Sequence, residues 1–167
     1  AGTPIRVMQI DRTLKKVSGL RAIQGQELGF GNVFSDHMLV REWVNGEWGQ
    51  PMITPRAPIP VEPSALGIHY GQSVFEGLKA YRGSQDQTIR LFRPDRNAAR
   101  LETSSTRLCI PTLCAEEFIE CICQLVAADA EWVPREREHA LYVRPMVFAS
   151  EGHLAVRPAS RYQLVIT

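Results

Sequence analysis

The sequence predicts a domain of the α+β class, in which a mostly antiparallel sheet packs against two main helices. Two kinds of pattern support this prediction. In two places a pair of extended segments is separated by a short turn containing glycine, which is typical of an antiparallel hairpin. Two later segments have the periodicity of amphipathic helices. The chain has 167 residues, and this length suits one domain with a core of its own.

The first hairpin follows an N-terminal arm. Residues 1–30 show weak periodicity and are assigned to this arm, whereas residues 34–43 have the composition of a strand. Asn45 and Gly46 form a pair typical of a type I′ turn, after which the chain returns as far as Trp48. Five prolines then predict an extended surface connection without a domain boundary. They are Pro51, Pro55, Pro58, Pro60 and Pro63.

The second hairpin lies near the middle of the chain. Residues 74–81 are predicted as one strand, residues 83–86 as the turn, and residues 88–92 as the returning strand. Gly71 and Gly77 mark places where backbone or a ligand comes close. The hairpin leads directly into the first helix.

The two predicted helices differ in character. The first begins near Pro94, where the missing N–H of proline costs nothing. Its arginines are spaced so that they share one face, namely Arg93, Arg96, Arg100 and Arg107. The second spans residues 115–130 and has an apolar stripe at helical spacing, consisting of Phe118, Ile122, Leu125 and Val126. Its acidic residues are expected on the solvated side, namely Glu116, Glu117 and Asp129.

The last part of the chain predicts two further strands. Residues 135–138 are expected to form a solvated loop, and residues 140–149 a single strand buried on both faces, because few positions are polar. A turn at residues 150–153 precedes a final strand at residues 162–167. Because natural domains rarely end within a strand, the sequence is expected to be the first part of a longer polypeptide.

Composition narrows the functional classes. A hydrophobic content of 44% indicates a globular protein, and a net charge of +1 argues against strong attraction to nucleic acid or membranes. The sequence has neither a signal peptide nor an apolar run that could span a bilayer, so a cytoplasmic protein is expected. The cysteines are expected to be buried or half-buried thiols, without metal, because no histidine pair adds zinc spacing. They are Cys109, Cys114, Cys121 and Cys123.

Several motifs occur together in a fixed order. DHMLVREW and EWGQP precede YGQSVFEGLKAYRG, and IRLFRPDRNAARL and ALYVRPMVFASEGHLAV follow. In this combination the chain resembles branched-chain amino-acid aminotransferases, which are class IV aminotransferases of PLP fold type IV. The resemblance runs from about Gly31 to Thr167. It implies that residues 31–167 form the small domain of such an enzyme, and that the large domain lies outside this sequence.

The resemblance also implies an activity. Enzymes of this family use pyridoxal 5′-phosphate (PLP) to transfer the amino group of leucine, isoleucine or valine to 2-oxoglutarate, giving branched 2-oxo acids and glutamate. They work as homodimers with shared active sites. Their PLP-binding lysine lies in the large domain, and Lys79 of FEGLKA does not match it. No catalytic residue and no metal site are therefore expected within this chain.

Arg100 is the predicted cofactor-binding residue. A guanidinium group presents a planar fork of donors that suits a phosphate dianion better than an ammonium group does. The resemblance implies that Arg100, within FRPDRNAAR, binds the phosphate of PLP. The alternative is a surface arginine on a helix face, and this alternative is kept for Arg93, Arg96 and Arg107.

Tyr142 and Arg144 are two residues apart in a predicted strand, so their side chains share one face. An arginine on so apolar a strand needs an anion or a hydrogen-bond network to offset its desolvation. The resemblance implies that the pair binds and orients the α-carboxylate of the substrate. The alternatives are a structural ion pair for Arg144 and a satisfied core tyrosine.

Four apolar residues complete the predicted site. A pocket for branched aliphatic chains needs apolar walls. The resemblance implies that Phe75 lines the pocket of its own subunit, whereas Tyr70, Leu154 and Val156 reach toward that of the partner. The residues alone would place all four in the core.

Other functions stay open at this stage. D-amino-acid aminotransferases and aminodeoxychorismate lyase share the same fold type and carry similar strings. The arginine face of the first helix could bind RNA, but the net basic charge and exposed aromatics of such a surface are missing. A further alternative is a non-catalytic ligand-binding module.

Overall fold

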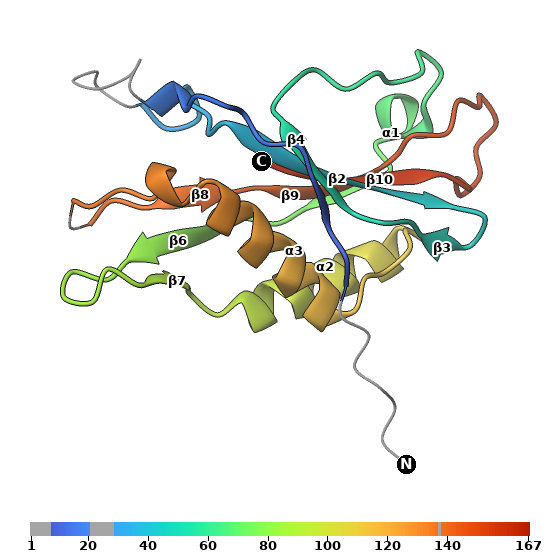
Figure 1. Ribbon diagram of the computed structural model, residues 1–167. Helices are drawn as coiled ribbons and strands as arrows, with labels where there is room; N and C mark the ends of the chain where they lie inside the picture. Colours follow the sequence, from blue (N-terminus) through green and yellow to red (C-terminus); the bar gives the residue numbers. More distant parts are fainter. Residues whose placement is uncertain (1–7, 21–28, 137) are drawn as a thin grey trace.

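The protein consists of two sheets and a layer of helices (Figure 1). The computed structural model describes residues 8–20, 29–136 and 138–167. The predicted arm therefore includes two stretches, 1–7 and 21–28, that lie outside the described residues, as does residue 137 of the predicted loop.

Within the described residues, the larger sheet contains seven strands. They are β1 (Asp11–Arg12), β2 (His37–Val44), β3 (Glu47–Trp48), β4 (Met52–Pro55), β5 (Ser73–Phe75), β9 (Pro145–Ala149) and β10 (Tyr162–Ile166). Their order is β1-β4-β2-β10-β9-β5, with β3 paired to β2. The smaller sheet has the order β7-β6-β8 and contains β6 (Leu78–Arg82), β7 (Ile89–Leu91) and β8 (Leu141–Val143).

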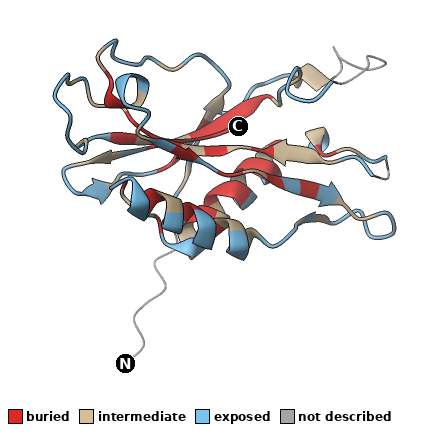
Figure 2. Cartoon of the chain, turned by 180° about the vertical axis from the view of Figure 1, so that it is seen from behind, coloured by how far each residue is buried: buried red, intermediate tan, exposed pale blue. Residues whose placement is uncertain are grey.

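The helices are α1 (Leu66–His69), α2 (Pro94–Arg107) and α3 (Ala115–Ala128), and a 3-10 turn (Ala130–Trp132) follows α3. Helices α2 and α3 lie together on one side of the sheets, and α1 lies on the other side (Figures 1 and 2). Within the described residues, no helix combines the length and the apolar character needed to cross a lipid bilayer. The predicted α+β class, with mostly antiparallel strands and two main helices, is confirmed.

The core lies between the helices and the sheets (Figure 2). All four residues of the predicted α3 stripe are buried, namely Phe118, Ile122, Leu125 and Val126. Helix α3 packs against α2 and β2. Burial of its one apolar stripe is what stabilises an amphipathic helix. Strand β10 pairs with both β2 and β9, and its Leu164 and Ile166 have no exposed surface. The final strand is thus an interior strand of the larger sheet.

Both predicted hairpins are present. Asn45 and Gly46 have positive φ values of 57° and 87°, as a type I′ turn requires, and β2 pairs with β3 across this turn. The rings of Trp43 and Trp48 meet edge to face, 5.5 Å apart. Strands β6 and β7 form the second hairpin.

The proline-rich segment contains a strand that was not predicted. Strand β4 pairs with β2 on one side and with β1 on the other, and Ile53 has no exposed surface. The prediction of a surface connection is therefore wrong for residues 51–55. Pro51 precedes the strand and Pro55 ends it, which are positions where a missing N–H does not interrupt a ladder.

Two long predicted strands are each divided. The segment 74–81 forms β5 in the larger sheet and β6 in the smaller one, and the segment 140–149 forms β8 and β9 in the same way. The chain passes between the sheets at residues 76–77 and at Arg144. We call this place the sheet junction. It carries the residues of the candidate site.

Asp129 is buried, which corrects the prediction that it lies on the solvated side of α3. It is 3% exposed and follows the last residue of the helix. Its carboxylate accepts hydrogen bonds from the backbone N–H and the ring Nδ1 of His37, at 3.1 and 2.6 Å. Because the helix ends earlier than predicted, Asp129 points toward β2 and ties the two elements together.

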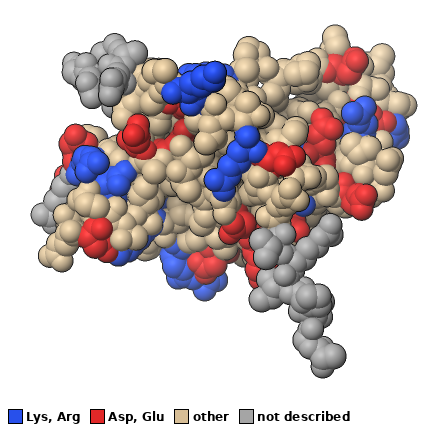
Figure 3. Space-filling view, in the orientation of Figure 1, with Lys and Arg blue, Asp and Glu red and all other residues tan. Residues whose placement is uncertain are grey.

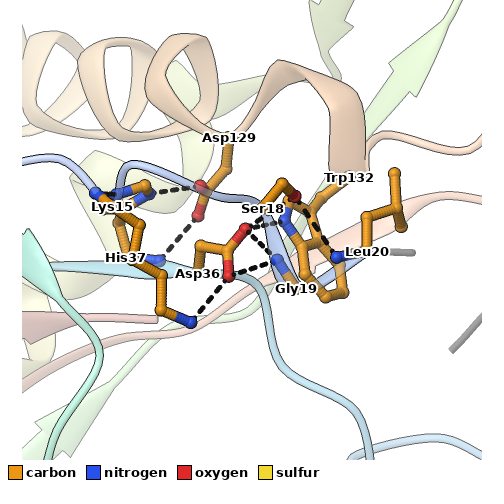
Figure 4. A network of polar contacts seen from close by, with 8 residues as sticks. All are labelled: Lys15, Ser18, Gly19, Leu20, Asp36, His37, Asp129 and Trp132. Atoms are coloured by element: carbon orange, nitrogen blue, oxygen red, sulfur yellow. Dashed lines mark hydrogen bonds and ion pairs between the residues drawn. The ribbon is translucent and has the colours of Figure 1, made fainter. Parts of the chain in front are cut away.

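A second buried carboxylate fastens the N-terminal segment to the turn after α3 (Figure 4). Asp36 is 4% exposed and accepts hydrogen bonds from Lys15 Nζ, Ser18 Oγ, the Gly19 N–H and Trp132 Nε1, at 2.8–3.1 Å. Burial by itself would raise the pKa of Asp36, but these donors outweigh burial and hold the pKa well below its usual range.

Substitution of Asp36 by asparagine should destabilise the protein by about 2 kcal/mol at neutral pH, because a buried acceptor of several hydrogen bonds loses its charge. The pKa of Asp36 is lowered on folding, so its stabilisation is complete above pH ~4 and is lost as the pH falls further. Denaturant unfolding at pH 7 and pH 3 should therefore give a smaller difference between Asp36→Asn and the parent protein at pH 3.

The matched control is Asp86→Asn. In the parent protein the Asp86 carboxylate is exposed and pairs with Arg90. It should change the unfolding free energy much less than Asp36→Asn does. Equal effects of the two substitutions would contradict the proposed anchoring role of Asp36.

Candidate functional site

At the sheet junction, two antiparallel segments stay paired while they pass from one sheet to the other. Phe75 lies opposite Met146 in the larger sheet, and Leu78 lies opposite Val143 in the smaller one. This is the same register on both sides, and the Glu76 N–H donates to the carbonyl of Pro145 at 2.9 Å. Gly77 consequently falls opposite Arg144. Strand alternation therefore continues through the junction.

One face of the junction gathers two aromatic rings and a cation, which we call the Arg144 cluster (Phe75, Tyr142 and Arg144). Arg144 donates from Nε and Nη2 to the hydroxyl oxygen of Tyr142, at 3.1 and 2.7 Å. Its guanidinium carbon lies 4.3 Å from the centre of the Phe75 ring. The structure thus brings three predicted site residues together. Tyr142 and Arg144 share one face, as their spacing predicts, and Phe75 joins them from the paired strand.

The Arg144 cluster holds a positive charge that no acidic side chain of the described residues neutralises. Tyr142 accepts from the arginine, so its own hydroxyl hydrogen stays available for an acceptor. The alternative of a structural ion pair is thereby set aside for the described part of the chain. A carboxylate is the ligand that such a cation and hydroxyl group would bind.

Gly77 allows this cluster to form. A Cβ atom at residue 77 would lie 2.2 Å from the hydroxyl oxygen of Tyr142 and 2.9 Å from its Cζ atom. Any side chain would therefore displace the tyrosine from Arg144. A close approach at Gly77 is present, but it is made by the Tyr142 side chain and not by backbone or a ligand. The close approach predicted at Gly71 is wrong for the described residues, since an added Cβ there would meet nothing within 4 Å.

Arg100 projects from α2 and binds a buried carboxylate at the junction. Its Nε and Nη2 donate to the two oxygens of Glu76, both at 2.6 Å. The Arg100 side chain is 67% exposed, whereas that of Glu76 is only 2% exposed. Burial would raise the pKa of Glu76, but hydrogen bonds from Arg100 and Asn97 outweigh burial and lower it.

Glu76 is a further site residue that was not predicted, although its position in the sequence carries a signal. Glu76 occupies the same alternation as Val74 and Leu78, which are buried residues of the two strands. A carboxylate at an inward position of an apolar strand requires a partner, because charged residues are rarely buried unpaired.

Tyr70 and Leu154 contact each other, and Val156 follows Leu154 two residues later in the same loop. The hydroxyl of Tyr70 donates to the carbonyl of Leu154 at 2.5 Å. Leu154 and Val156 are 67% and 83% exposed, and Tyr70 and Phe75 are exposed as well. The expectation from the residues alone, that all four belong to the core, is wrong.

The remaining charged candidates lie at the surface. Arg93 precedes α2 with a left-handed φ of 48° and pairs with Asp95, and Arg96 and Arg107 are exposed. Lys79 is exposed on β6, opposite Tyr142. On the face seen in Figure 3, Lys and Arg alternate with Asp and Glu, so its long-range attraction to a partner of one charge is weak.

The cysteines differ from the expectation. Cys121 is fully buried, and burial raises the pKa of its thiol to about 12, so it is unreactive. Cys109, Cys114 and Cys123 are exposed, although all four were expected to be buried or half-buried. Cys121 and Cys123 do face different sides of α3, as their spacing predicts.

Comparison with solved structures defines the class of fold. The chain superposes with a TM-score of 0.57 on a branched-chain aminotransferase from Thermoproteus uzoniensis, at 21% identity, covering 76% of this chain and 39% of that one. It superposes with a TM-score of 0.57 on the branched-chain amino acid aminotransferase of Escherichia coli, at 23% identity, covering 75% and 38%. A further match, with a TM-score of 0.54, is a branched-chain amino acid aminotransferase complexed with N-(5′-phosphopyridoxyl)-L-glutamate. The fold is therefore that of one part of a fold-type IV aminotransferase.

Sequence comparison then gives the particular relatives. The chain is 45% identical to branched-chain-amino-acid aminotransferase 2 of Bacillus subtilis and 48% identical to the branched-chain-amino-acid aminotransferase of Mycobacterium tuberculosis, in each case over 84% of this chain. It spans 39% of the length of either relative. No family model matches the chain. The predicted resemblance to branched-chain-amino-acid aminotransferases is confirmed.

Substitution of Gly77 by alanine should destabilise the protein by about 2 kcal/mol, because the added methyl group overpacks against Tyr142. In a Tyr142→Ala background the same substitution should cost much less, since the ring that it meets is gone. Denaturant unfolding of the two single variants and the double variant measures this coupling. An equal cost of Gly77→Ala in both backgrounds would contradict the close approach.

Proposed function

We propose that the protein transfers amino groups from branched-chain amino acids to 2-oxoglutarate, and that this chain supplies its small domain. The Arg144 cluster carries this proposal, because it combines a cation without an acidic partner among the described residues, a free hydroxyl hydrogen and an aromatic wall. A free amino acid or 2-oxo acid always presents a carboxylate. The names of the relatives support the choice of substrate.

Within this proposal, Arg144 and Tyr142 bind and orient the α-carboxylate of the substrate. Arg144 is held in place by the Tyr142 hydroxyl and by the face of the Phe75 ring, so little of its rotational freedom is lost on binding. Phe75 is 60% exposed and offers an apolar wall to an aliphatic side chain. A fixed carboxylate sets the direction in which the rest of the substrate points.

Arg100 would bind the phosphate group of PLP. Two of its N–H groups donate to Glu76. The N–H groups on the outer edge of the guanidinium can reach a ligand, because the side chain is 67% exposed. This donor set fits a phosphate dianion, which accepts two parallel N–H bonds. When bound, PLP carries the amino group between the two substrates. We assign the lysine that binds PLP to the large domain.

We further propose a homodimer in which Tyr70, Leu154 and Val156 face the site of the partner. These residues are exposed apolar groups, and the Tyr70 hydroxyl fixes the position of the Leu154 backbone. Exposed apolar residues close together on a globular protein mark interaction surfaces. A second copy of the chain is the partner that the family resemblance implies.

The intact protein should convert leucine and 2-oxoglutarate to 4-methyl-2-oxopentanoate and glutamate only when PLP is supplied. Arg144→Lys keeps the charge but loses the fork of donors, so kcat/KM for leucine should fall by about 100-fold. The matched control is Arg161→Lys, an exposed arginine before β10, which should leave kcat/KM unchanged. Absence of transamination by the intact protein, or full activity of Arg144→Lys, would overturn the proposal.

Val156→Glu should shift the intact protein from dimer to monomer at micromolar concentrations. Val156 is 83% exposed, so the substitution costs little in the single chain but buries an unpaired charge in the proposed interface. Analytical ultracentrifugation measures the shift. Val17→Glu, at a valine that is 78% exposed on the N-terminal segment, is the control and should stay dimeric. A monomeric parent protein, or an unchanged Val156→Glu dimer, would contradict the proposed interface.

A further inference from the structure

The two members of the ion pair between Glu76 and Arg100 differ strongly in solvent exposure. The carboxylate is almost completely buried, while its guanidinium partner lies largely in solvent. Exposed ion pairs contribute little, and they rarely hold an arginine in one conformation. Here one member is fixed by the fold, so the other has a fixed place to bind.

Two interactions besides Arg100 hold Glu76 in place. Its backbone N–H donates to the Pro145 carbonyl at the sheet junction, and the Asn97 amide donates to its Oε2 at 2.8 Å. The carboxylate therefore stays in place whether or not Arg100 is engaged. It is a rigid acceptor, and the long arginine side chain is the movable member of the pair.

The geometry divides the hydrogens of Arg100 into two sets. Nε and one hydrogen of Nη2 point at the two oxygens of Glu76 in a parallel, two-bond arrangement. This arrangement fixes the plane of the guanidinium group. One hydrogen of Nη1 and the second hydrogen of Nη2 then form the outward edge, and the other hydrogen of Nη1 points back beside Cδ. An incoming anion meets an arginine that has already lost most of its rotational freedom.

We propose that Glu76 is a positioning residue, which orients Arg100 so that its outward edge binds the phosphate group of the cofactor. This proposal rests on the proposed function, since it requires that Arg100 binds a phosphate. Glu76 itself touches no ligand. It acts through Arg100 alone, and Asn97 supports it from the preceding turn of α2.

Glu76 could also have the opposite effect on phosphate binding by Arg100. A carboxylate next to Arg100 could compete with the phosphate, and its removal would then tighten phosphate binding. The geometry favours positioning, because Glu76 occupies only the inner edge of the guanidinium and is fixed there by Asn97 and by its backbone bond to Pro145. The two roles predict changes of opposite sign.

The experiment compares PLP with pyridoxal, which lacks the phosphate group but is otherwise the same compound. The cofactor-free intact protein is titrated with each compound, and the two dissociation constants are measured from the change in absorption. Glu76→Gln should raise the dissociation constant of PLP about ten-fold, the size of one lost charge-assisted hydrogen bond. The dissociation constant of pyridoxal should change less than about two-fold, because Arg100 does not contact it.

Arg100→Ala and Arg96→Ala complete the comparison. Arg100→Ala should weaken PLP binding by more than about ten-fold and leave pyridoxal binding unchanged, and adding Glu76→Gln to it should have no further effect. Arg96 lies one turn earlier on the same helix and is 76% exposed, so Arg96→Ala should leave both constants unchanged.

Each outcome decides between the hypotheses. If Arg100→Ala has no selective effect on PLP, the phosphate assignment of the proposed function fails. If Arg100→Ala is selective but Glu76→Gln is silent, tightens PLP binding, or weakens both compounds equally, only the positioning role fails. Should Glu76→Gln not fold, Asn97→Ala decides, since it loosens Glu76 without removing a buried charge. It should weaken PLP binding two- to three-fold with pyridoxal unchanged, roughly the loss of one neutral hydrogen bond, and equal effects on both compounds would overturn the role.

Discussion

The pairing that continues through the sheet junction is the constraint on which the candidate site depends. Two antiparallel segments leave one sheet and enter the next without changing register. Residues alternate between the two faces of the paired segment. Val74, Glu76 and Leu78 are on the buried face, and Phe75, Gly77 and Lys79 are on the opposite face. A shift by one residue would exchange the two sets, placing apolar residues in solvent and the site residues in the core.

The two site arginines show how the same side chain is used in two ways. Arg100 has a buried carboxylate on its inner edge, so its charge is balanced and its orientation fixed. Arg144 has a hydroxyl group and an aromatic face as neighbours, which orient it without reducing its charge. The first arrangement suits a ligand with a high charge of its own, and the second suits a single carboxylate.

The sequence predicted those features that depend on local spacing. The stripe of α3, the Asn45-Gly46 turn and the shared face of Tyr142 and Arg144 follow from fixed periods of 3.6 and 2 residues. The division of the two long strands could not be predicted in this way. Two paired strands that keep their register through a bend also keep the period-two alternation of their side chains. Nothing in the pattern of residues 74–81 therefore marks the change of sheet.

Other features depend on partners that are distant in the sequence. Strand β4 was hidden by its prolines, since its place between β1 and β2 is a property of the sheet and not of the segment. Asp129 was assigned to solvent because its partner, His37, lies 92 residues earlier. Glu76 was missed for the same reason, because the arginine that balances its charge and the asparagine that donates to it come from the next helix.

Gly77 links the two halves of the site. Its missing side chain makes room for the hydroxyl of Tyr142, and its carbonyl accepts a hydrogen bond from Asn97 at 3.3 Å. The same Asn97 amide also holds Glu76, and through Glu76 it holds Arg100. Arg144, proposed to bind a carboxylate, lies in this paired segment, and Arg100, proposed to bind a phosphate, is held against its Glu76. Their spacing is set by backbone hydrogen bonds, which are stiffer than any contact between side chains, and this stiffness is what orientation of two anionic ligand groups requires.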